Sequence, residues 1–178
     1  MQNKNLTFTN VIIAITVIMY LIQTSIENGS LYLGLNVFFL EGLWYQPLST
    51  MFAHGGIGHL LMNMFVLFQF GNLIEKYRGA KTFLILYFVG GLLTSVFSFA
   101  FIYSIGLYHN LVGASGALCV LLGYVAFVDK SQRKGIITWV LIISVAPLLI
   151  GLSIAWYSHF IGLGVGFLFG GIRKLKSN

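Results

Sequence analysis

Six apolar stretches separated by shorter polar segments divide this chain. Hydrophobic runs read against their polar interruptions place them at 10–27, 57–75, 82–103, 114–128, 135–152 and 157–172. A membrane-spanning helix needs about 20 mostly apolar residues, and fewer in a protected interior position. The pattern therefore predicts six membrane-spanning helices in a single domain, residues 1–178. No small-residue cleavage site follows the first stretch, so we expect a span there rather than a signal peptide.

Composition agrees with this pattern. The chain is 58% hydrophobic and 8% charged, with a mean hydropathy of +0.91. Such values are typical of an integral membrane protein, and together with the run lengths they predict an all-α polytopic fold. The single cysteine, Cys119, lies inside an apolar stretch and is expected to be a packing residue.

The basic residues all fall at one predicted end of the helices. They are Lys4, Lys76, Arg78, Lys81, Lys130, Arg133, Lys134, Arg173, Lys174 and Lys176. Basic residues concentrate on the cytoplasmic side of membrane proteins, so both termini are expected inside and the loops 28–56, 104–113 and 153–156 outside. The net charge of +6 then reflects topology. No soluble domain offers a basic face for nucleic acid, and the expected partner is the lipid bilayer.

The long outer loop, 28–56, joins the first two predicted helices. It is rich in aromatic and aliphatic residues, including Tyr32, Phe38, Trp44 and Tyr45. Such a loop is expected to lie in the membrane interface rather than in water. The pattern leaves open whether it is an ordinary anchor or a structural element beside a functional site.

Two polar residues, Ser115 and His159, lie inside apolar stretches at matching depth. Ser115 is fourteen residues before Asp129, and His159 is fourteen residues before Arg173. At about 1.5 Å rise per residue, each lies about 21 Å above the inner boundary of a hydrocarbon core about 30 Å thick. Polar residues at such depth are costly and commonly functional.

Two further polar residues, His59 and Asn63, bracket the same level. They lie sixteen and twelve residues before Glu75 and one helical turn apart, on one helix face. Four polar side chains from three predicted helices therefore share one layer.

The helix that carries His159 also carries a stripe of small residues. Gly162, Gly166 and Gly170 follow at spacings of four, and the Ser115 helix offers Gly113, Ala114, Gly116, Ala117 and Gly123. Small residues at every fourth position let two membrane helices touch along their backbones. We therefore expect the Ser115 and His159 helices to pack closely.

This layer has the side chains for acyl transfer. A serine hydroxyl becomes a nucleophile when a base removes its proton, and histidine is the commonest such base. The four acidic residues, Glu27, Glu41, Glu75 and Asp129, all lie in loops or at helix ends, where none can orient the imidazole, so a Ser115–His159 dyad is predicted. The side chains of His59 and Asn63 and the free backbone amides at Ala114 and Ser115 can supply donors to an oxyanion.

Three motifs in this order resemble the rhomboid intramembrane serine proteases, in their compact six-helix bacterial form. The segment from His54 through His59 to Asn63 is similar to the family's H-x4-H-x3-N, and Gly113-Ala114-Ser115-Gly116 to its G-x-S-G. The third is His159-x-x-Gly162-x-x-x-Gly166. Glu75-Lys76-Tyr77-Arg78-Gly79 also resembles the family's inner-loop E-x3-G signature.

The resemblance implies a role for each motif. Ser115 would be the nucleophile, His159 the general base, and His59 with Asn63 the side-chain part of the oxyanion hole. His54 would have a structural hydrogen-bonding role. The family cleaves single-span membrane proteins near the outer end of their helix without a metal or cofactor. The expected location is a bacterial plasma or inner membrane.

Three positions depart from the family pattern. Tyr45-Gln46 stands where many members have Trp-Arg in the outer loop, Cys119 where well-known members place an aromatic against the base, and Ser158 where alanine is usual. The first departure concerns how the outer loop is braced. The other two concern how His159 is held.

Other classes of protein fit the sequence less well. A zinc protease would need a His-Glu-x-x-His helix, and an aspartyl protease two membrane-embedded aspartates; neither pattern is present. A catalytically silent relative that binds membrane helices would share the fold but should have lost Ser115 or His159. A small channel or transporter should show paired half-helices, an intramembrane carboxylate or metal-ligand spacing.

Overall fold

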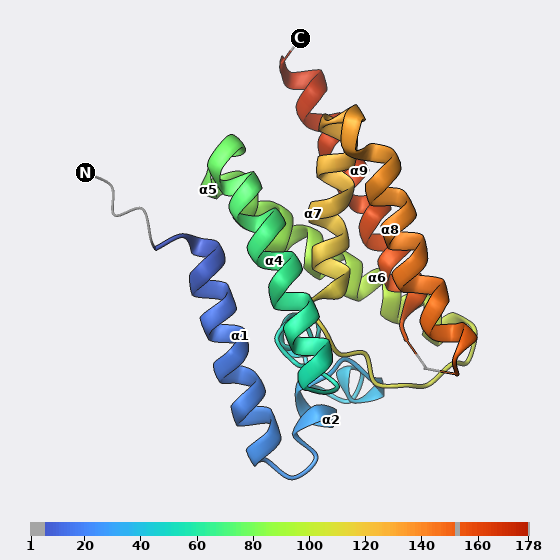
Figure 1. Cartoon of the computed structure of the whole chain (residues 1–178). Helices are drawn as coiled ribbons and strands as arrows, with labels where there is room; N and C mark the ends of the chain where they lie inside the picture. The colour runs from blue at the N-terminus through green and yellow to red at the C-terminus, as the bar shows by residue number, and fades with distance from the viewer. Residues whose placement is uncertain (1–5, 152–153, 178) are drawn as a thin grey trace.

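The protein is a bundle of helices in the computed structural model, which describes residues 6–151 and 154–177 (Figure 1). In chain order the elements are α1 (Phe8–Ser25), α2 (Gly29–Leu33), the 3-10 helix η1 (Val37–Phe39), α3 (Gln46–Ser49), α4 (Ile57–Arg78), α5 (Ala80–Leu84), the π-helix η2 (Ile85–Gly90), α6 (Gly91–Ser104), α7 (Ser115–Val128), α8 (Lys130–Leu149) and α9 (Trp156–Ser177). Because η2 continues α5 into α6, residues 80–104 form one rod. The described part of the chain contains no strand beyond one isolated bridge between Leu35 and Leu111.

Helix α7 forms the centre of the bundle. Every residue from Gly116 to Ala126 is buried. The helix packs most extensively on α9 and also contacts α4, α6 and α8 (Figure 1). A helix that is apolar on all sides is stable only when it is surrounded, which explains why this stretch lies innermost. Helix α1 packs on α4 at the edge of the bundle.

Four helical segments are long and apolar enough to cross a membrane. They are Phe8–Ser25, Ile57–Arg78, Ala80–Ser104 and Lys130–Leu149, whereas Ser115–Val128 and Trp156–Ile172 are shorter apolar helices. The 14 residues of α7 rise only about 21 Å, less than a hydrocarbon core of about 30 Å. The all-helical prediction is confirmed, and the count of six spans stays a prediction.

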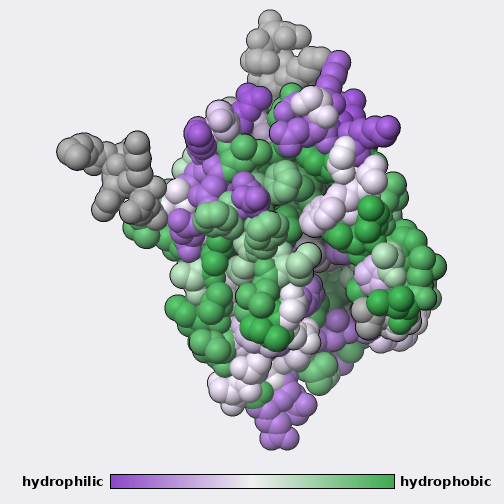
Figure 2. All heavy atoms as spheres, viewed as in Figure 1, coloured by the Kyte–Doolittle hydropathy of each residue, from purple (hydrophilic) through white to green (hydrophobic). Residues whose placement is uncertain are grey.

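The surface has the polarity expected in lipid. Figure 2 shows hydrophobic side chains across the middle of the visible face and hydrophilic ones at both ends. The α4–α5 junction and the α7–α8 turn, which carry six of the basic residues, lie at the same end as the start of α1 and the end of α9 (Figure 1). Lys4 lies outside the described residues, as do the side chains of Arg173, Lys174 and Lys176.

Capping side chains set helix ends that the apolar pattern misplaces. Helix α8 begins at Lys130, five residues before the expected start at 135. Asp129 explains this early start, because its Oδ1 accepts hydrogen bonds from the Ser131 backbone N–H at 2.9 Å and from the Ser131 hydroxyl at 2.6 Å. Such a side-chain acceptor stabilises the first turn of a helix.

Glu75, near the end of α4, caps the start of α1. Its carboxylate accepts the backbone N–H groups of Phe8 at 2.9 Å and Thr9 at 3.0 Å, and the Thr9 hydroxyl at 2.8 Å. A carboxylate at a helix N-terminus both satisfies orphan amides and complements the helix dipole. The glutamate of the E-x3-G motif thus joins α1 to α4.

We expect Glu75→Gln to lower the free energy of unfolding by about 1 kcal/mol, the usual cost of weakening a helix cap. The amide keeps one acceptor but loses the second oxygen and the charge. Unfolding in detergent micelles measures the change. Glu41→Gln is the matched control, because the exposed Glu41 side chain makes no hydrogen bond within the described ranges. Equal stability of the two variants would contradict this assignment.

Candidate active site

The outer loop is a folded unit braced by Gln46. This side chain is fully buried, accepts the Asn36 backbone N–H at 3.2 Å, and donates to the carbonyls of Leu31 at 3.1 Å and Tyr32 at 3.4 Å. The amide therefore ties α3 to two backbone groups of α2 and to one, that of Asn36, in the segment that follows it. Gln46 stands where arginine is usual in the family, and its amide holds the outer loop from that position.

A second contact joins this loop to the segment that precedes α7. The Asn36 side chain donates to Oδ1 of Asn110 at 2.8 Å, and Asn110 donates to the Ser30 carbonyl at 2.8 Å. Leu35 and Leu111 exchange two backbone hydrogen bonds of 2.9 Å each. The outer loop is therefore coupled to the residues just before Ser115.

Thr50 completes this coupling. Its hydroxyl donates to the Leu111 carbonyl at 2.6 Å, and its carbonyl accepts the Gly113 N–H at 3.0 Å. Gly113 has φ +126°, a conformation that side-chain-bearing residues rarely adopt. The chain turns sharply there and enters α7 at Ser115.

Ser115 is the first residue of α7 and is half-buried. The preceding Ala114 is fully buried and provides no side-chain cap. The Leu118 N–H makes the first intrahelical bond, to Ala114. The amides of Ser115, Gly116 and Ala117 therefore have no acceptor within the helix, and such orphan donors attract negative charge.

His59 and Asn63 of α4 lie against Gly113. A Cβ atom built on Gly113 would lie 2.6 Å from Cε1 and 2.8 Å from Nε2 of His59, and 3.6 Å from Nδ2 of Asn63. The Asn63 Nδ2 is buried and has no hydrogen-bond partner among the residues that the structure describes. A buried unpaired donor is rare and commonly has a functional reason. Here it faces the entrance to α7.

His159 is buried in α9 and hydrogen-bonded through Nδ1. The partner is the Ser144 hydroxyl of α8, at 2.9 Å. Two residues earlier on α9, the Tyr157 hydroxyl is hydrogen-bonded to Nε2 of His109 in the outer segment, at 2.6 Å. Burial lowers the pKa of His109, which favours its neutral form. These two contacts fix the start of α9 relative to its neighbours.

Glycine contacts bring the Ser115 and His159 helices together. A Cβ on Gly162, one turn after His159, would overlap the carbonyl of Gly116 and lie 3.0 Å from Cβ of Cys119. A Cβ on Gly116 would in turn lie 2.8 Å from the Ser158 hydroxyl. The expected close packing of α7 and α9 is therefore confirmed. No hydrogen bond joins Ser115 to His159 in the part of the chain that the structure describes.

A small cavity lies beside Ser115. Its volume is about 30 Å³, and its lining includes five hydroxyl-bearing residues, Thr50, Ser95, Ser98, Ser115 and Ser158. A water molecule needs about 10–15 Å³ of such space, so the cavity has room for about two. Within residues 6–151 and 154–177 the Ser98 hydroxyl is buried without a hydrogen-bond partner, as expected where water or a polar group is to be bound.

His54 lies outside the helices, at the end of the outer loop. Its backbone N–H and carbonyl are both hydrogen-bonded to the Gln23 side chain of α1, at 2.9 and 2.8 Å, and its ring packs edge-to-face on His59, with centroids 5.2 Å apart. Burial, followed by the neighbouring His59, lowers the pKa of His54 to about 4. His54 is therefore uncharged at neutral pH, and it supports His59 by packing.

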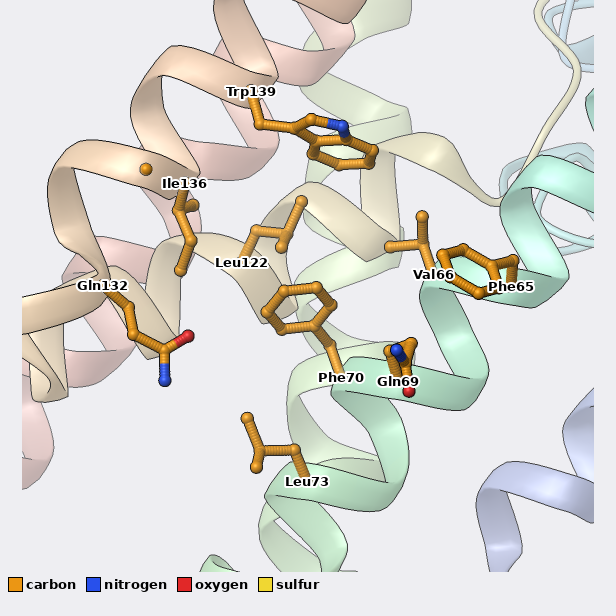
Figure 3. Close-up of a pocket in the computed structure, with 10 residues that line it drawn as sticks. Phe65, Val66, Gln69, Phe70, Leu73, Leu122, Gln132, Ile136 and Trp139 are labelled. Carbon is orange, nitrogen blue, oxygen red and sulfur yellow. The ribbon is translucent and has the colours of Figure 1, made fainter.

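A larger cavity of about 650 Å³ opens between α4, α7 and α8. Figure 3 shows mostly apolar side chains around it, among them Phe65 and Phe70 of α4, Leu122 of α7 and Trp139 of α8. Helices α4 and α8 are thus separated along one side of the bundle. Within the described ranges, no three His, Cys, Asp or Glu side chains are grouped as around a metal ion.

The chain has helices suited to crossing a bilayer, and polar side chains from α4, α7, α8 and α9 gather at one end of α7. These features define a helical membrane protein with a buried polar site. Residues 41–175 match the family model of the Rhomboid domain. The match covers more than half of the chain, so the chain belongs to the rhomboid family, and the resemblance drawn from the motifs is confirmed.

Individual bacterial and mitochondrial proteins of the family are also similar to this chain in sequence. The chain is 33% identical over 141 residues to the Rhomboid protease GluP of Bacillus subtilis (strain 168), covering 75% of this chain and 27% of that protein. The Putative rhomboid protease YdcA of the same strain is 29% identical over 143 residues, 76% of this chain and 70% of that protein. The Presenilin-associated rhomboid-like protein A, mitochondrial, of Danio rerio is 31% identical over 132 residues, 68% and 34% of the two chains.

Proposed function

We propose that this protein is an intramembrane serine endopeptidase. It cleaves single-span membrane proteins near the outer end of their transmembrane helix, with Ser115 as nucleophile and His159 as general base. Membership of the rhomboid family and the similarity to two Bacillus proteins that are named as rhomboid proteases support the activity. The retention of both Ser115 and His159 argues against a catalytically silent relative.

The observation that carries this proposal is the buried, unpartnered Asn63 amide beside the open start of α7. An anion that forms next to Ser115 meets this donor, the His59 ring and the backbone amides of Ala114 and Ser115 at the start of α7. Donors placed in advance, where charge develops in the transition state, are the largest single source of catalysis in many enzymes. These groups form the proposed oxyanion hole.

The proposed reaction has two halves. The Ser115 Oγ attacks the carbonyl carbon of the scissile bond while His159 takes its proton, and His159 then gives that proton to the departing amine nitrogen. Water hydrolyses the resulting acyl-serine, again with His159 as the base. The hydroxyl-lined cavity beside Ser115 has room for that water.

We place the site in the outer half of a bacterial cell membrane, with six spanning helices and both ends of the chain in the cytoplasm. The gathering of the basic loops at one end of the bundle supports this orientation. The short α7 begins below the outer surface, and the folded outer loop lies above it. Substrate enters laterally between α4 and α8; the large apolar cavity separates these two helices in the inner half of the bundle, below the site.

Cleavage in liposomes tests the function. A panel of single-span reporter proteins is reconstituted with the wild-type chain, and the products are identified by mass. A fluorophosphonate, which reacts with activated serines, is then added, and the residue that it labels is identified by peptide mass. We expect one dominant cut near the outer end of the reporter helix and labelling at Ser115. A folded protein that binds the reporters but neither cleaves them nor reacts would be the silent relative instead.

A further inference from the structure

Ser144 of α8 makes two hydrogen bonds through one hydroxyl. Its Oγ lies 2.6 Å from the Val140 carbonyl oxygen and 2.9 Å from Nδ1 of His159. The Ser144 side chain is fully buried, so water does not compete for these contacts. A hydroxyl has one proton and can accept as well as donate.

The direction of the two bonds fixes where the proton of His159 lies. The Val140 carbonyl can only accept, so the Ser144 proton points to it. The Ser144 oxygen must then accept from His159, which places the imidazole proton on Nδ1. The other ring nitrogen, Nε2, is left with a free lone pair, as a base needs in order to take a proton from Ser115.

We propose that Ser144 is a positioning residue, which holds His159 in the Nδ1–H tautomer and fixes the plane of its ring. It acts through His159 and does not touch substrate. In serine proteases this task commonly falls to a carboxylate, but the four acidic residues of this chain all lie in loops or at helix ends. A neutral hydroxyl performs it here without burying a charge in the membrane. The proposal rests on the proposed function, because positioning a base matters only where the base acts.

The location of Ser144 makes this contact depend on how α8 is docked. The buried residues of α8 are Ile136, Val140 and Ser144, a single stripe with a spacing of four. Pro147 lies inside the helix less than one turn beyond Ser144 and removes one backbone donor from its last turns. A displacement of this end of α8 would therefore break the bond to His159.

Few other groups near His159 titrate. The titratable side chains on the neighbouring helices are His59 of α4 and Cys119 of α7, and Cys119 lies against Gly162, one turn further along α9. The buried stripe of α8 contributes only the Ser144 hydroxyl. Substitution of Ser144 therefore leaves the charges around His159 unchanged.

Substitutions at Ser144 test the proposal through kinetics. We expect Ser144→Ala to lower kcat about tenfold, the value of one neutral hydrogen bond, with KM within about twofold of wild type. Ser144→Thr keeps the hydroxyl and should restore most of kcat. Thr16→Val is the matched control, because Thr16 is also a buried helix residue whose hydroxyl donates to the carbonyl four residues earlier, at 2.8 Å, but it lies on α1. It should leave kcat unchanged.

Nitrogen-15 NMR of histidine-labelled protein gives a readout independent of activity. Assigned with a His159→Asn variant, the His159 signals should show the proton on Nδ1 in the wild-type chain and in Ser144→Thr, and a mixture of tautomers in Ser144→Ala. A proton on Nε2 in the wild type, or a Ser144→Ala variant with wild-type tautomer and kcat, would overturn the proposal. If no form of the chain cleaves any reporter, the proposed function fails, and the NMR result still decides whether Ser144 sets the tautomer.

Discussion

Ser115→Ala is expected to abolish cleavage of membrane reporters, with a fall in kcat of about 10⁴-fold or more. The alanine removes the atom that forms the acyl-enzyme and leaves only binding and the oxyanion donors. His159→Ala should lower kcat by about as much, because the nucleophile and its base act as a unit. The double variant should be no worse than either single variant. Initial rates of product formation in liposomes, measured at matched protein density, give all three values.

Ser158→Ala is the matched control for this pair. Ser158 directly precedes His159, lies against Gly116 and lines the same small cavity as Ser115, so its loss also removes a hydroxyl at the site. We expect cleavage within severalfold of wild type, because the Ser158 hydroxyl has no part in the proton transfers. Full loss in Ser158→Ala with residual cleavage in Ser115→Ala would show that the nucleophile is wrongly assigned.

The apolar pattern predicted the helices well because each long run must be buried in lipid or protein. It placed their ends less well, because caps and tertiary contacts decide them. Helix α1 begins at Phe8 rather than at residue 10, because Glu75 of α4 accepts hydrogen bonds from the first backbone amides of α1. Polar acceptors that lie 65 or more residues away in sequence leave no periodic signal.

The fold of the outer loop could not be predicted from the sequence for a similar reason. Its aromatic composition predicted a location at the interface, but its shape depends on side chains that bond distant backbone groups. Gln46 replaces an expected arginine, and only the structure shows that its amide braces three backbone groups. The bridge from Leu35 to Leu111 joins segments separated along the chain by η1, α3, α4 and the rod of residues 80–104.

Ser144 could have been predicted from the sequence. It lies fourteen residues after Lys130, the same count that relates Ser115 to Asp129 and His159 to Arg173. The depth argument therefore places it in the same layer. A serine inside a membrane helix commonly donates a hydrogen bond to the carbonyl four residues earlier, so its presence alone does not indicate a functional role. Its second bond, to His159, becomes visible only when α8 and α9 are packed together.

Gly166→Ala is expected to lower the free energy of unfolding by about 3 kcal/mol, at the upper end of the usual cost of overpacking. A Cβ at this position would overlap the Val120 carbonyl and lie 2.7 Å from the Tyr124 backbone nitrogen and 2.9 Å from Cα of Gly123. Backbone atoms cannot rotate away as a side-chain end can. Helices α7 and α9 must therefore separate, and cleavage should fall as Ser115 and His159 move apart.

Gly164→Ala isolates this effect from the helix propensity of alanine. Gly164 lies two residues away on the same helix, and a Cβ there would meet nothing within 4 Å. Both variants make the same chemical change and gain the same preference for helix, worth up to about 1 kcal/mol. Only Gly166 lies in the contact with α7. Reversible unfolding in micelles should therefore show Gly164→Ala near or above wild type and Gly166→Ala well below it. Equal stability of the two would mean that the glycine contact contributes little, and that α9 is held to α7 by its larger side chains.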